Sequence, residues 1–321
     1  MNRYTRQMML PQVGTEGQAR LAAARVLVVG AGGLAASALP LLAAAGVGRI
    51  DIFDGDRIEL SNLHRQTLFT EADVGRAKAE VAAERCRALN SESVLTGTKR
   101  SITPENVVQN GQNADLVLDC ADSYAASYLL SDTCLALGKP LISASVLGLG
   151  GYAGGFCGGA PSLRAVFPDA PDGTASCATA GVLGPVVSIL GSIQAQMALS
   201  VLMGLAPSPL GQIVQVDAQT WRNSAFRFDD APEPVTAFRF VAPSELTTED
   251  LIIELRSEDE APRPAHPSAL RMTTPEITIS DTNKGKRLAL CCATGLRAWR
   301  MAERLQPDWP GEIVLVAAAT S

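Results

Sequence analysis

The sequence has little charge, and the positive charge it has is not clustered. Its 321 residues include 27 lysines and arginines against 33 aspartates and glutamates, which gives a net charge of −6. With no basic block, a nucleic-acid partner is not expected. Charged residues make up 19% and hydrophobic residues 47% of the chain. This composition argues against disorder and is sufficient for one large α/β domain and a smaller one.

The sequence also lacks a regular cysteine framework. Its seven cysteines are odd in number and irregularly spaced, so they do not predict a set of disulfides. No secretory signal opens the chain, and we therefore expect a cytoplasmic protein in a reducing compartment, with some thiols available for chemistry. The seven are Cys86, Cys120, Cys134, Cys157, Cys177, Cys291 and Cys292.

No charged residue occurs between positions 178 and 205, a length that could span a bilayer. Several residues interrupt its apolar character, namely Gly181, Gly184, Pro185, Gly191, Gln194 and Gln196. No cluster of lysine or arginine flanks it. We therefore expect a helix buried in a core or at a subunit interface, and no membrane partner.

Short apolar runs alternate with longer helical patterns over the first part of the chain. A strand at 25–30, a helix at 35–46 and a strand at 49–54 form a βαβ unit. The alternation continues with helices at 75–89 and 123–137 and strands at 115–119 and 140–144. It predicts a Rossmann-like, doubly wound α/β fold with a mostly parallel sheet.

The composition changes at 229–234, where acidic residues and prolines suggest a linker. Beyond it, strands are predicted at 251–255 and 287–291 and a helix at 297–305. We therefore predict a large domain over 1–230, a linker over 231–240 and a small C-terminal α/β unit over 241–321.

A glycine-rich turn joins the first predicted strand to the first helix. Gly30, Gly32 and Ala35 match the pattern G-x-G-x-x-G/A. Such a turn lets backbone approach a phosphate, and the helix N-terminus adds N–H donors. Asp54 ends the second strand, where a carboxylate can bind ribose hydroxyls. Alone, the turn indicates a nucleotide, with NAD as the default, and the alternative is a tight turn with no ligand.

Among the cations that follow Asp54 in the chain, Arg65, Arg76 and Lys78 bear on which nucleotide is bound. A triphosphate that loses pyrophosphate develops charge on its leaving group, and fixed cations stabilise that charge. The alternative is a solvated charged loop.

Residues 1 to about 225 resemble the HesA/MoeB/ThiF family, the bacterial relatives of ubiquitin-activating enzymes. The matching segments occur in the family's order: Arg3-Tyr-Thr-Arg-Gln7, Gly30-Ala-Gly-Gly-Leu34, Asp54-x-Asp56, Ser61-Asn-Leu-His-Arg-Gln66, Gly75-Arg-x-Lys78, Asp119-Cys-Ala-Asp122 and 177–185.

The resemblance implies a homodimeric enzyme that uses ATP and Mg²⁺. In it, Gly33 would pack against the nucleotide, Asp54 would hold the ribose and Asp122 would hold Mg²⁺. Asn62, Arg65 and Lys78 would contact phosphates, and Arg6 would reach into the partner's site. The nucleotide site would further include Asp56, Ser61, Gln66 and Ser123. An ionised carboxylate needs no general base, so this set can work by positioning and charge neutralisation.

The sequence departs from the family's pattern at a structural zinc site. Many members carry two Cys-x-x-Cys pairs, and here Ser162 and Ala165 stand where the first pair would be. Four thiolates are needed for a closed site, so we expect no zinc. Ser123 and Ala35 are milder departures, standing where the family usually has asparagine and glycine.

Cys177 lies in a small polar segment before the uncharged helix. A helix N-terminus can lower a thiol's pKa. In ThiF-like members the matching cysteine bonds to the carrier protein, whereas in MoeB-like members it is less essential. An unreactive loop cysteine is the alternative.

The C-terminal unit resembles a short rhodanese-like domain. Cys292 and Arg297 are spaced as in Cys-x-x-Gly-x-Arg loops, whose N–H groups would stabilise a thiolate or persulfide. Cys292 would carry the persulfide and Cys291 would point into the core. The alternative is a degenerate domain retained for docking.

The two resemblances together imply ATP-dependent adenylation of the C-terminal glycine of a ubiquitin-like sulfur carrier. We prefer a ThiS-like carrier of thiamine synthesis to a MoaD-like carrier of molybdopterin synthesis. The alternatives are adenylation of another peptide or small carboxylate, a non-catalytic carrier-binding scaffold, and an NAD-dependent oxidoreductase.

Overall fold

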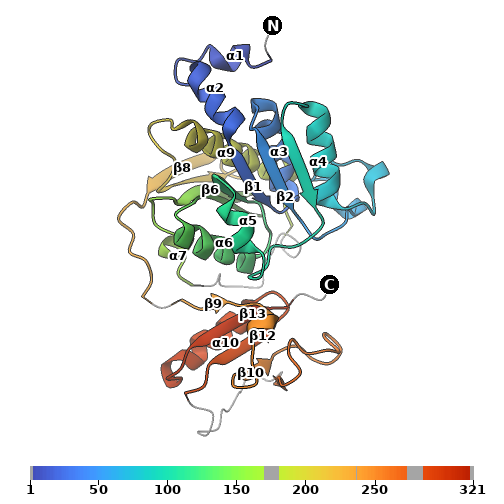
Figure 1. Ribbon diagram of the computed structural model, residues 1–321, viewed down its shortest axis with the longest axis vertical. Coiled ribbons are helices and arrows are strands. Elements are labelled where there is room, and N and C mark those ends of the chain that lie inside the picture. Colours follow the sequence, from blue (N-terminus) through green and yellow to red (C-terminus); the bar gives the residue numbers. More distant parts are fainter. Residues whose placement is uncertain (1–2, 170–180, 236, 273–284, 319–321) are drawn as a thin grey trace.

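The computed structural model describes residues 3–169, 181–235, 237–272 and 285–318. They form an eight-stranded sheet with helices on both faces, followed by a smaller five-stranded sheet (Figure 1). The predicted α/β fold class is thereby confirmed.

The first unit begins with two short helices and then alternates strands with helices. In chain order its elements are α1 (Thr5–Met8), α2 (Gly14–Ala23), β1 (Arg25–Val29), α3 (Gly33–Ala45), β2 (Arg49–Phe53), η1 (Leu60–Asn62), η2 (Glu71–Asp73), α4 (Lys78–Leu89), β3 (Val94–Thr98), α5 (Val107–Gln112), β4 (Leu116–Asp119), α6 (Tyr124–Leu137), β5 (Pro140–Leu147), β6 (Gly150–Cys157), α7 (Leu163–Val166), α9 (Gly184–Met203), β7 (Gln212–Asp217) and β8 (Arg222–Arg227).

The large sheet has the strand order β3-β2-β1-β4-β5-β6-β7-β8. Its first five strands are parallel, and β6, β7 and β8 are added antiparallel. The order reverses at β1, because β2 lies on one side of β1 and β4 on the other. In doubly wound sheets, ligands bind beside the carboxyl ends of the strands at such a reversal.

Alternate residues of β1 point to opposite faces of the sheet. Val26 and Val28 belong to a buried cluster shared with α3, α4 and α9. Leu27 and Val29 belong to a second cluster shared with α5 and α6. Burial on both faces explains why the parallel strands read as continuous apolar runs.

The uncharged stretch forms α9, which packs closely on α3. A Cβ atom at Gly191 would lie only 2.4 Å from the carbonyl oxygen of Leu34, so glycine permits this approach. Among the described residues, α9 is the one helix long and apolar enough to cross a membrane, and half of it is buried inside the protein. The expectation of a core or interface helix agrees with this burial.

The second unit is a parallel sheet with the order β11-β10-β12-β13-β9. Its elements are β9 (Arg239–Phe240), η3 (Pro243–Glu245), β10 (Leu251–Glu254), β11 (Leu270–Arg271), β12 (Leu288–Cys292), α10 (Leu296–Leu305), η5 (Gln306–Asp308) and β13 (Ile313–Ala317). Because β9 pairs with β13, this sheet begins within the segment 231–240.

The two units share one buried cluster. Ala125 and Tyr128 of α6 join the core of the second unit, in which Trp299 is the largest fully buried side chain. Arg164 lies between the units, 97% buried, and donates to the carbonyl oxygen of Phe238 at 3.0 Å. The carboxyl ends of the parallel strands of the large sheet face the second unit (Figure 1).

Candidate nucleotide site and its neighbouring thiol

The glycine turn after β1 is shaped by a close approach of two strand ends. Gly30 has φ +91°, and a Cβ atom there would lie 2.5 Å from the carbonyl oxygen of Cys120. Only glycine accepts both conditions. The turn therefore brings the first N–H groups of α3 to the carboxyl edge of the sheet, next to the residues that follow β4.

The segment 61–66 packs against this turn. A Cβ atom at Gly33 would lie 2.7 Å from Val187 and 3.3 Å from the carbonyl oxygen of Arg65. At Gly184, the first residue of α9, a Cβ atom would lie 2.5 Å from the carbonyl oxygen of His64. On the side where a Cβ would stand, Gly33 therefore contacts Val187 and the backbone of Arg65. Because glycine has no side chain there, Arg65 can lie beside the glycine turn.

Arg65 is held by neutral groups alone. Its Nη1 donates to the Ser61 carbonyl oxygen at 3.2 Å and to His64 Nε2 at 2.8 Å. In the part of the chain that the structure describes, no carboxylate pairs with it. Ser61 itself is exposed, and its hydroxyl donates to Glu59 at 3.2 Å. The guanidinium of Arg65 therefore keeps its charge available to an anionic ligand.

Two amide side chains of the same segment are buried. Asn62 accepts from the Glu59 N–H at 3.3 Å and so organises the turn η1. Gln66 is 4% exposed, and its Nε2 lies near Gly32, 3.7 Å from the position of a Cβ there. The Oε1 of Gln66 has no hydrogen-bond partner among the described residues. Such a buried acceptor beside the turn is a position where a bound ligand or water would supply a donor.

Asp54 ties the turn to the end of β2. Its Oδ2 accepts from the Ala31 N–H at 2.7 Å and its Oδ1 accepts from the Asp56 N–H at 2.7 Å. Burial raises the pKa of Asp54, and these two N–H bonds oppose that effect. The Asp54 carboxylate thus fixes the glycine turn, and the same carboxylate is the group predicted to bind the ribose hydroxyls.

Lys78 begins α4 and points back to the same edge. Its Nζ lies 2.9 Å from Asp56 Oδ2, with the lysine side chain 9% exposed and the aspartate side chain 70% exposed. The backbone repeats the contact, because the Lys78 N–H donates to the Asp56 carbonyl oxygen at 3.0 Å. In this structure Lys78 is therefore paired with Asp56, and a phosphate would have to compete with that carboxylate.

Asp122 and Ser123 lie after β4, on the other side of the strand-order reversal. Asp122 is exposed and forms no hydrogen bond or ion pair with the described residues, and Ser123 is the residue directly before α6. No group of three or more His, Cys, Asp or Glu side chains that could hold a metal occurs among the described residues. Mg²⁺ commonly binds one or two carboxylates together with substrate phosphates, so a single free carboxylate here fits that ion.

Beneath Asp122 lies a buried network that the sequence did not reveal. Asp119 is fully buried, its carboxylate accepts from the Ser143 hydroxyl at 2.7 Å, and its carbonyl oxygen accepts from Gln194 at 2.7 Å. The Asp119 carboxylate also accepts from the Ala121 N–H at 3.1 Å. These bonds fix the turn that carries Asp122. The available signals were an aspartate ending an apolar strand and a glutamine within an apolar helix.

Arg6 is not brought to this edge. It lies on α1, exposed, at the end of the molecule where the parallel strands begin (Figure 1). The neighbouring Tyr4 is in contact with Gly46 and Asn90, beyond the ends of α3 and α4. Arg6 is thus remote from the nucleotide turn of its own chain.

The loop that would carry the zinc cysteines is held by hydrogen bonds. The Ser162 hydroxyl donates to Glu233 at 2.5 Å and accepts from the N–H groups of Arg164 and Ala165. The Ser162 N–H also donates to Glu233 at 2.7 Å. Packing and hydrogen bonds therefore join 162–165 to the segment that leads into the second unit. Cys177 lies outside the described residues.

Cys292 ends β12 and is enclosed, with 1% of its surface exposed. Its sulfur accepts from the N–H of Gly295 at 3.1 Å and from that of Ala298 at 3.4 Å. These donors belong to the loop and first turn of α10, where the helix dipole favours negative charge. Arg297 pairs with Glu260. Cys291 is fully buried, and burial raises its pKa to about 12, so it is an inert core thiol.

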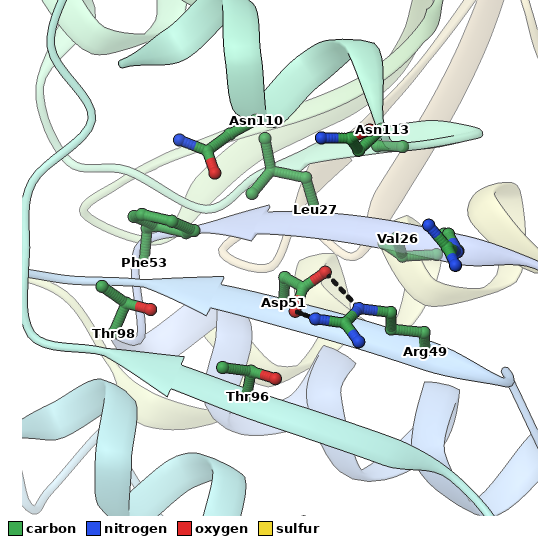
Figure 2. A pocket seen from close by; sticks show the side chains of 11 residues that line it. Val26, Leu27, Arg49, Asp51, Phe53, Thr96, Thr98, Asn110 and Asn113 are labelled. Carbon is green, nitrogen blue, oxygen red and sulfur yellow. Dashed lines mark hydrogen bonds and ion pairs between the residues drawn. The ribbon is translucent and has the colours of Figure 1, made fainter.

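A cavity of about 470 Å³ lies elsewhere, on the face of β1, β2 and β3 that α5 only partly covers (Figure 2). Asn110 of α5 and Asn113, directly after that helix, border it on one side and Thr96 of β3 on the other, with the Arg49–Asp51 pair between them. A six-residue helix is only about 9 Å long and cannot cover three strands. The cavity contains none of the predicted site residues.

Comparison with known proteins identifies a family and several relatives of this chain. The ThiF family matches residues 4–234. The bovine (Bos taurus) adenylyltransferase and sulfurtransferase MOCS3 is 44% identical over 221 residues, covering 68% of this chain and 49% of that protein. The sulfur carrier protein adenylyltransferase of Thermus thermophilus is 42% identical over 226 residues, covering 68% of this chain and 83% of that protein.

The chain spans about half the length of the MOCS3 and uba4 relatives that it matches. Among solved structures, E. coli MccB has a TM-score of 0.65 at 22% identity, covering 75% of this chain and 73% of its own. PaaA has a TM-score of 0.61 at 21% identity, covering 70% of this chain and 72% of its own. These structures share the fold.

Proposed function

Because the chain belongs to the ThiF family, we propose that it is an adenylyltransferase that uses ATP to activate the C-terminal glycine of a small sulfur carrier protein. The observation that carries the proposal is the guanidinium of Arg65, which pairs with no carboxylate among the described residues and whose backbone packs on Gly33 of the glycine turn. A dinucleotide site needs little side-chain charge, whereas a leaving pyrophosphate is stabilised by fixed cations.

The chemistry requires few groups from the protein. One oxygen of the carrier's ionised carboxylate attacks the α-phosphorus of ATP, the bond to the bridging oxygen breaks, and pyrophosphate leaves with the electron pair. Arg65 and Lys78 would neutralise charge on the phosphates, and Asp54 would orient the ribose. Asp122 would hold Mg²⁺, which supplies further charge neutralisation when bound. Catalysis is then positioning and electrostatic stabilisation.

The carrier is inferred from the relatives, one of which is named as acting on a sulfur carrier protein. A ThiS-like carrier is our first choice and a MoaD-like carrier the second. The test is pyrophosphate–ATP exchange with each purified carrier. Exchange that depends on one carrier's intact C-terminal glycine supports both the reaction and the partner.

Exchange with neither carrier, in a protein that binds Mg-ATP by calorimetry, would contradict the carrier assignment. Tight binding of NAD in place of ATP would contradict the adenylation itself. Because the two measurements address different steps, they separate a wrong partner from a wrong chemistry.

We further propose a homodimer in which Arg6 serves the partner's site. Arg6 is remote from the glycine turn of its own chain, which supports this proposal. If Arg6 has the catalytic role that the family resemblance implies, it can act only in the site of a second copy. The neighbouring helices α3 and α9 contain no charged residue and expose Leu41 and Ile189 by 44% and 41%. Uncharged faces of this kind are typical of subunit interfaces.

We propose that the second unit is a sulfurtransferase in which Cys292 carries a persulfide. The N–H donors around its sulfur support this role, because they would stabilise an anionic sulfur. Cys177 would form a covalent bond with the carrier in a ThiF-like reaction, and thiocarboxylate formation by a Cys177→Ser variant decides between that role and an unreactive cysteine. The six described cysteines are free, consistent with a cytoplasmic protein.

A further inference from the structure

The loop that holds the Cys292 thiol is seated on the first turn of α6. A Cβ atom at Gly295 would lie 3.3 Å from the Cβ of Ala125 and 2.6 Å from the Phe240 ring, so no side chain fits between loop and helix. Trp299 of α10 lies over the same turn, with its ring centroid 6.2 Å from that of Tyr124. The thiol is therefore enclosed partly by the adenylating unit itself.

Tyr124 is the residue of α6 whose polar atom lacks a partner in this interface. Its hydroxyl oxygen is shielded from solvent and makes no hydrogen bond with the described residues. Its ring packs edge-on to Tyr128, Phe240 and Trp299, in the same cluster as Cys292. Burial raises the pKa of Tyr124, and the Cys292 thiol acts in the same direction, so the hydroxyl keeps its proton and remains a donor.

A buried hydroxyl without a partner normally indicates a missing group. No hydrogen bond joins the Tyr124 hydroxyl to the Cys292 thiol. A persulfide would place a second sulfur about 2 Å beyond the first, at the length of a sulfur–sulfur bond. That outer sulfur is anionic and accepts hydrogen bonds.

We propose that Tyr124 donates a hydrogen bond to the outer sulfur of a persulfide on Cys292, and so positions the sulfur that the second unit delivers. Tyr124 follows Asp122 by two residues, at the start of α6. The outer sulfur would thus be held by a residue of the adenylating unit, beside the edge at which the carrier's acyl adenylate forms. The inference rests on the proposed sulfurtransferase role of Cys292.

Persulfide formation with thiosulfate gives a balanced first step. The Cys292 thiolate attacks the outer sulfur of thiosulfate, the sulfur–sulfur bond of thiosulfate breaks, and sulfite leaves with the electron pair. The new sulfur–sulfur bond joins Cys292 to the transferred sulfur, which carries the negative charge. Because Cys292 is only 1% exposed, loading is run to completion before measurement.

The experiment compares the full-length protein with its Tyr124→Phe and Tyr128→Phe variants. Tyr128→Phe is the matched control, since its hydroxyl lies in the same cluster but already donates to the carbonyl oxygens of Phe167 at 2.7 Å and Asp169 at 3.1 Å. Each protein is loaded with thiosulfate, and the modified cysteine is identified by mass spectrometry, with Cys292→Ser as the negative control. The alkylation rates of the persulfide and of the unloaded Cys292 thiol by iodoacetamide are then measured.

We expect a persulfide on Cys292 that is alkylated about fivefold to tenfold faster in Tyr124→Phe, the size of one lost hydrogen bond, with Tyr128→Phe unchanged. The unloaded thiol should react equally in all three. Equal persulfide rates, or parallel acceleration of thiol and persulfide, would overturn the proposal, as would a wild-type protein without persulfide on Cys292. None of these readings needs ATP or a carrier, so failed pyrophosphate exchange would be a separate result.

Discussion

At the scale of single residues, the carboxyl edge holds a cation and a carboxylate that form no ion pair with the described residues. Arg65 donates to neutral acceptors, and Asp122 is exposed and has no hydrogen bond to a described residue. Lys78 differs, because Asp56 neutralises it in this structure. Arg65 can therefore bind a phosphate without losing an ion pair, whereas Lys78 must first break its ion pair with Asp56. The two cations should therefore respond differently to substitution.

Replacing either cation tests the proposed chemistry. We expect Arg65→Ala and Lys78→Ala to lower carrier-dependent pyrophosphate–ATP exchange about 100-fold to 1000-fold, because each removes charge stabilisation that acts on the leaving group. Lys78→Ala should also weaken ATP binding, since Asp56 is then left unneutralised next to the phosphates. The exposed cations Arg87 and Lys99 provide controls, whose alanine variants should retain exchange. Near-normal exchange in both site variants would refute the assignment.

Gly30 can be tested against a glycine with the same backbone but open surroundings. Gly30 and Gly75 have φ values of +91° and +86°, but a Cβ at Gly30 meets the Cys120 carbonyl whereas none lies within 4 Å of Gly75. We expect Gly75→Ala to lower the free energy of unfolding by about 1 kcal/mol, the backbone cost alone. Gly30→Ala should cost roughly 2 kcal/mol more, because strand ends must separate. Equal losses in urea unfolding would show that the close approach is unimportant.

The residues that the sequence identified are those that have a local signature. Gly30 and Gly32 follow a strand directly, and Arg65 belongs to a distinctive segment. Tyr124 has no such signature, and the segment that contains Asp119 did not reveal its buried network, since both roles depend on what packs against them from positions far along the chain. Gln194 is 75 positions from Asp119, with which it bonds. A contact of this range is fixed by the topology and cannot be read from spacing.

At the scale of elements, the connection from β2 to α4 positions most of the site, and Asp73 anchors it. The Asp73 side chain is 3% exposed and accepts from Arg85 at 2.7 Å, from Arg76 at 3.0 Å and from Thr70 at 2.8 Å. Burial alone would raise the pKa of Asp73, but the hydrogen bonds from Arg85 and Thr70 outweigh it and lower that pKa to about 2. The connection therefore depends on an ionised carboxylate.

This anchor predicts how stability changes with pH. The folded pKa of about 2 lies below the unfolded value of about 3.9, so the carboxylate stabilises the fold above pH 4 and loses that effect as pH falls toward 2. Asp73→Asn should lower the free energy of unfolding by about 2 kcal/mol at pH 7, and the difference should shrink at pH 3. Urea unfolding measures both, with Asp230→Asn at an exposed position as the control. A deficit independent of pH would contradict the role of charge.

Element prediction succeeded where the apolar pattern was strong and failed where it was absent. The strands around the glycine turn and the helix that became α6 were predicted within a few residues. The antiparallel strands β6 and β8 were not, because β6 contains four glycines and β8 is exposed along its whole length. These two strands form because they pair with β5 and β7, although their own sequences have no apolar strand pattern. The two-residue strand β9 is too short to leave a pattern.

At the scale of the whole molecule, α1 with Arg6 and the nucleotide turn lie at opposite ends of the large sheet (Figure 1). The sequence placed Arg6 in a catalytic set by resemblance alone, and no property of one chain could show which subunit's site it serves. The geometry restricts the choice, because the sheet separates Arg6 from its own turn. Any catalytic role of Arg6 must then be exercised in a second copy.

Mixed dimers test this arrangement directly. Arg6→Ala and Lys78→Ala should each be inactive as pure proteins. After the two are mixed at equal amounts and subunits exchange, we expect about one quarter of wild-type pyrophosphate–ATP exchange, because half of the dimers are mixed and each has one intact site. No recovery, in samples where native mass spectrometry of size-labelled subunits shows mixed dimers, would place Arg6 in its own subunit's site or outside catalysis.

The aromatic cluster that α6 shares with the second unit should also affect how these positions vary among related proteins. Tyr124 and Tyr128 are covered by Trp299 and Phe240 of the second unit, so neither set of aromatic residues can change without affecting the other. Substitutions at these positions should therefore be correlated among relatives that contain both units. In a relative that consists of the first unit alone, the same turn of α6 would face water. We therefore expect polar residues at these positions in such relatives.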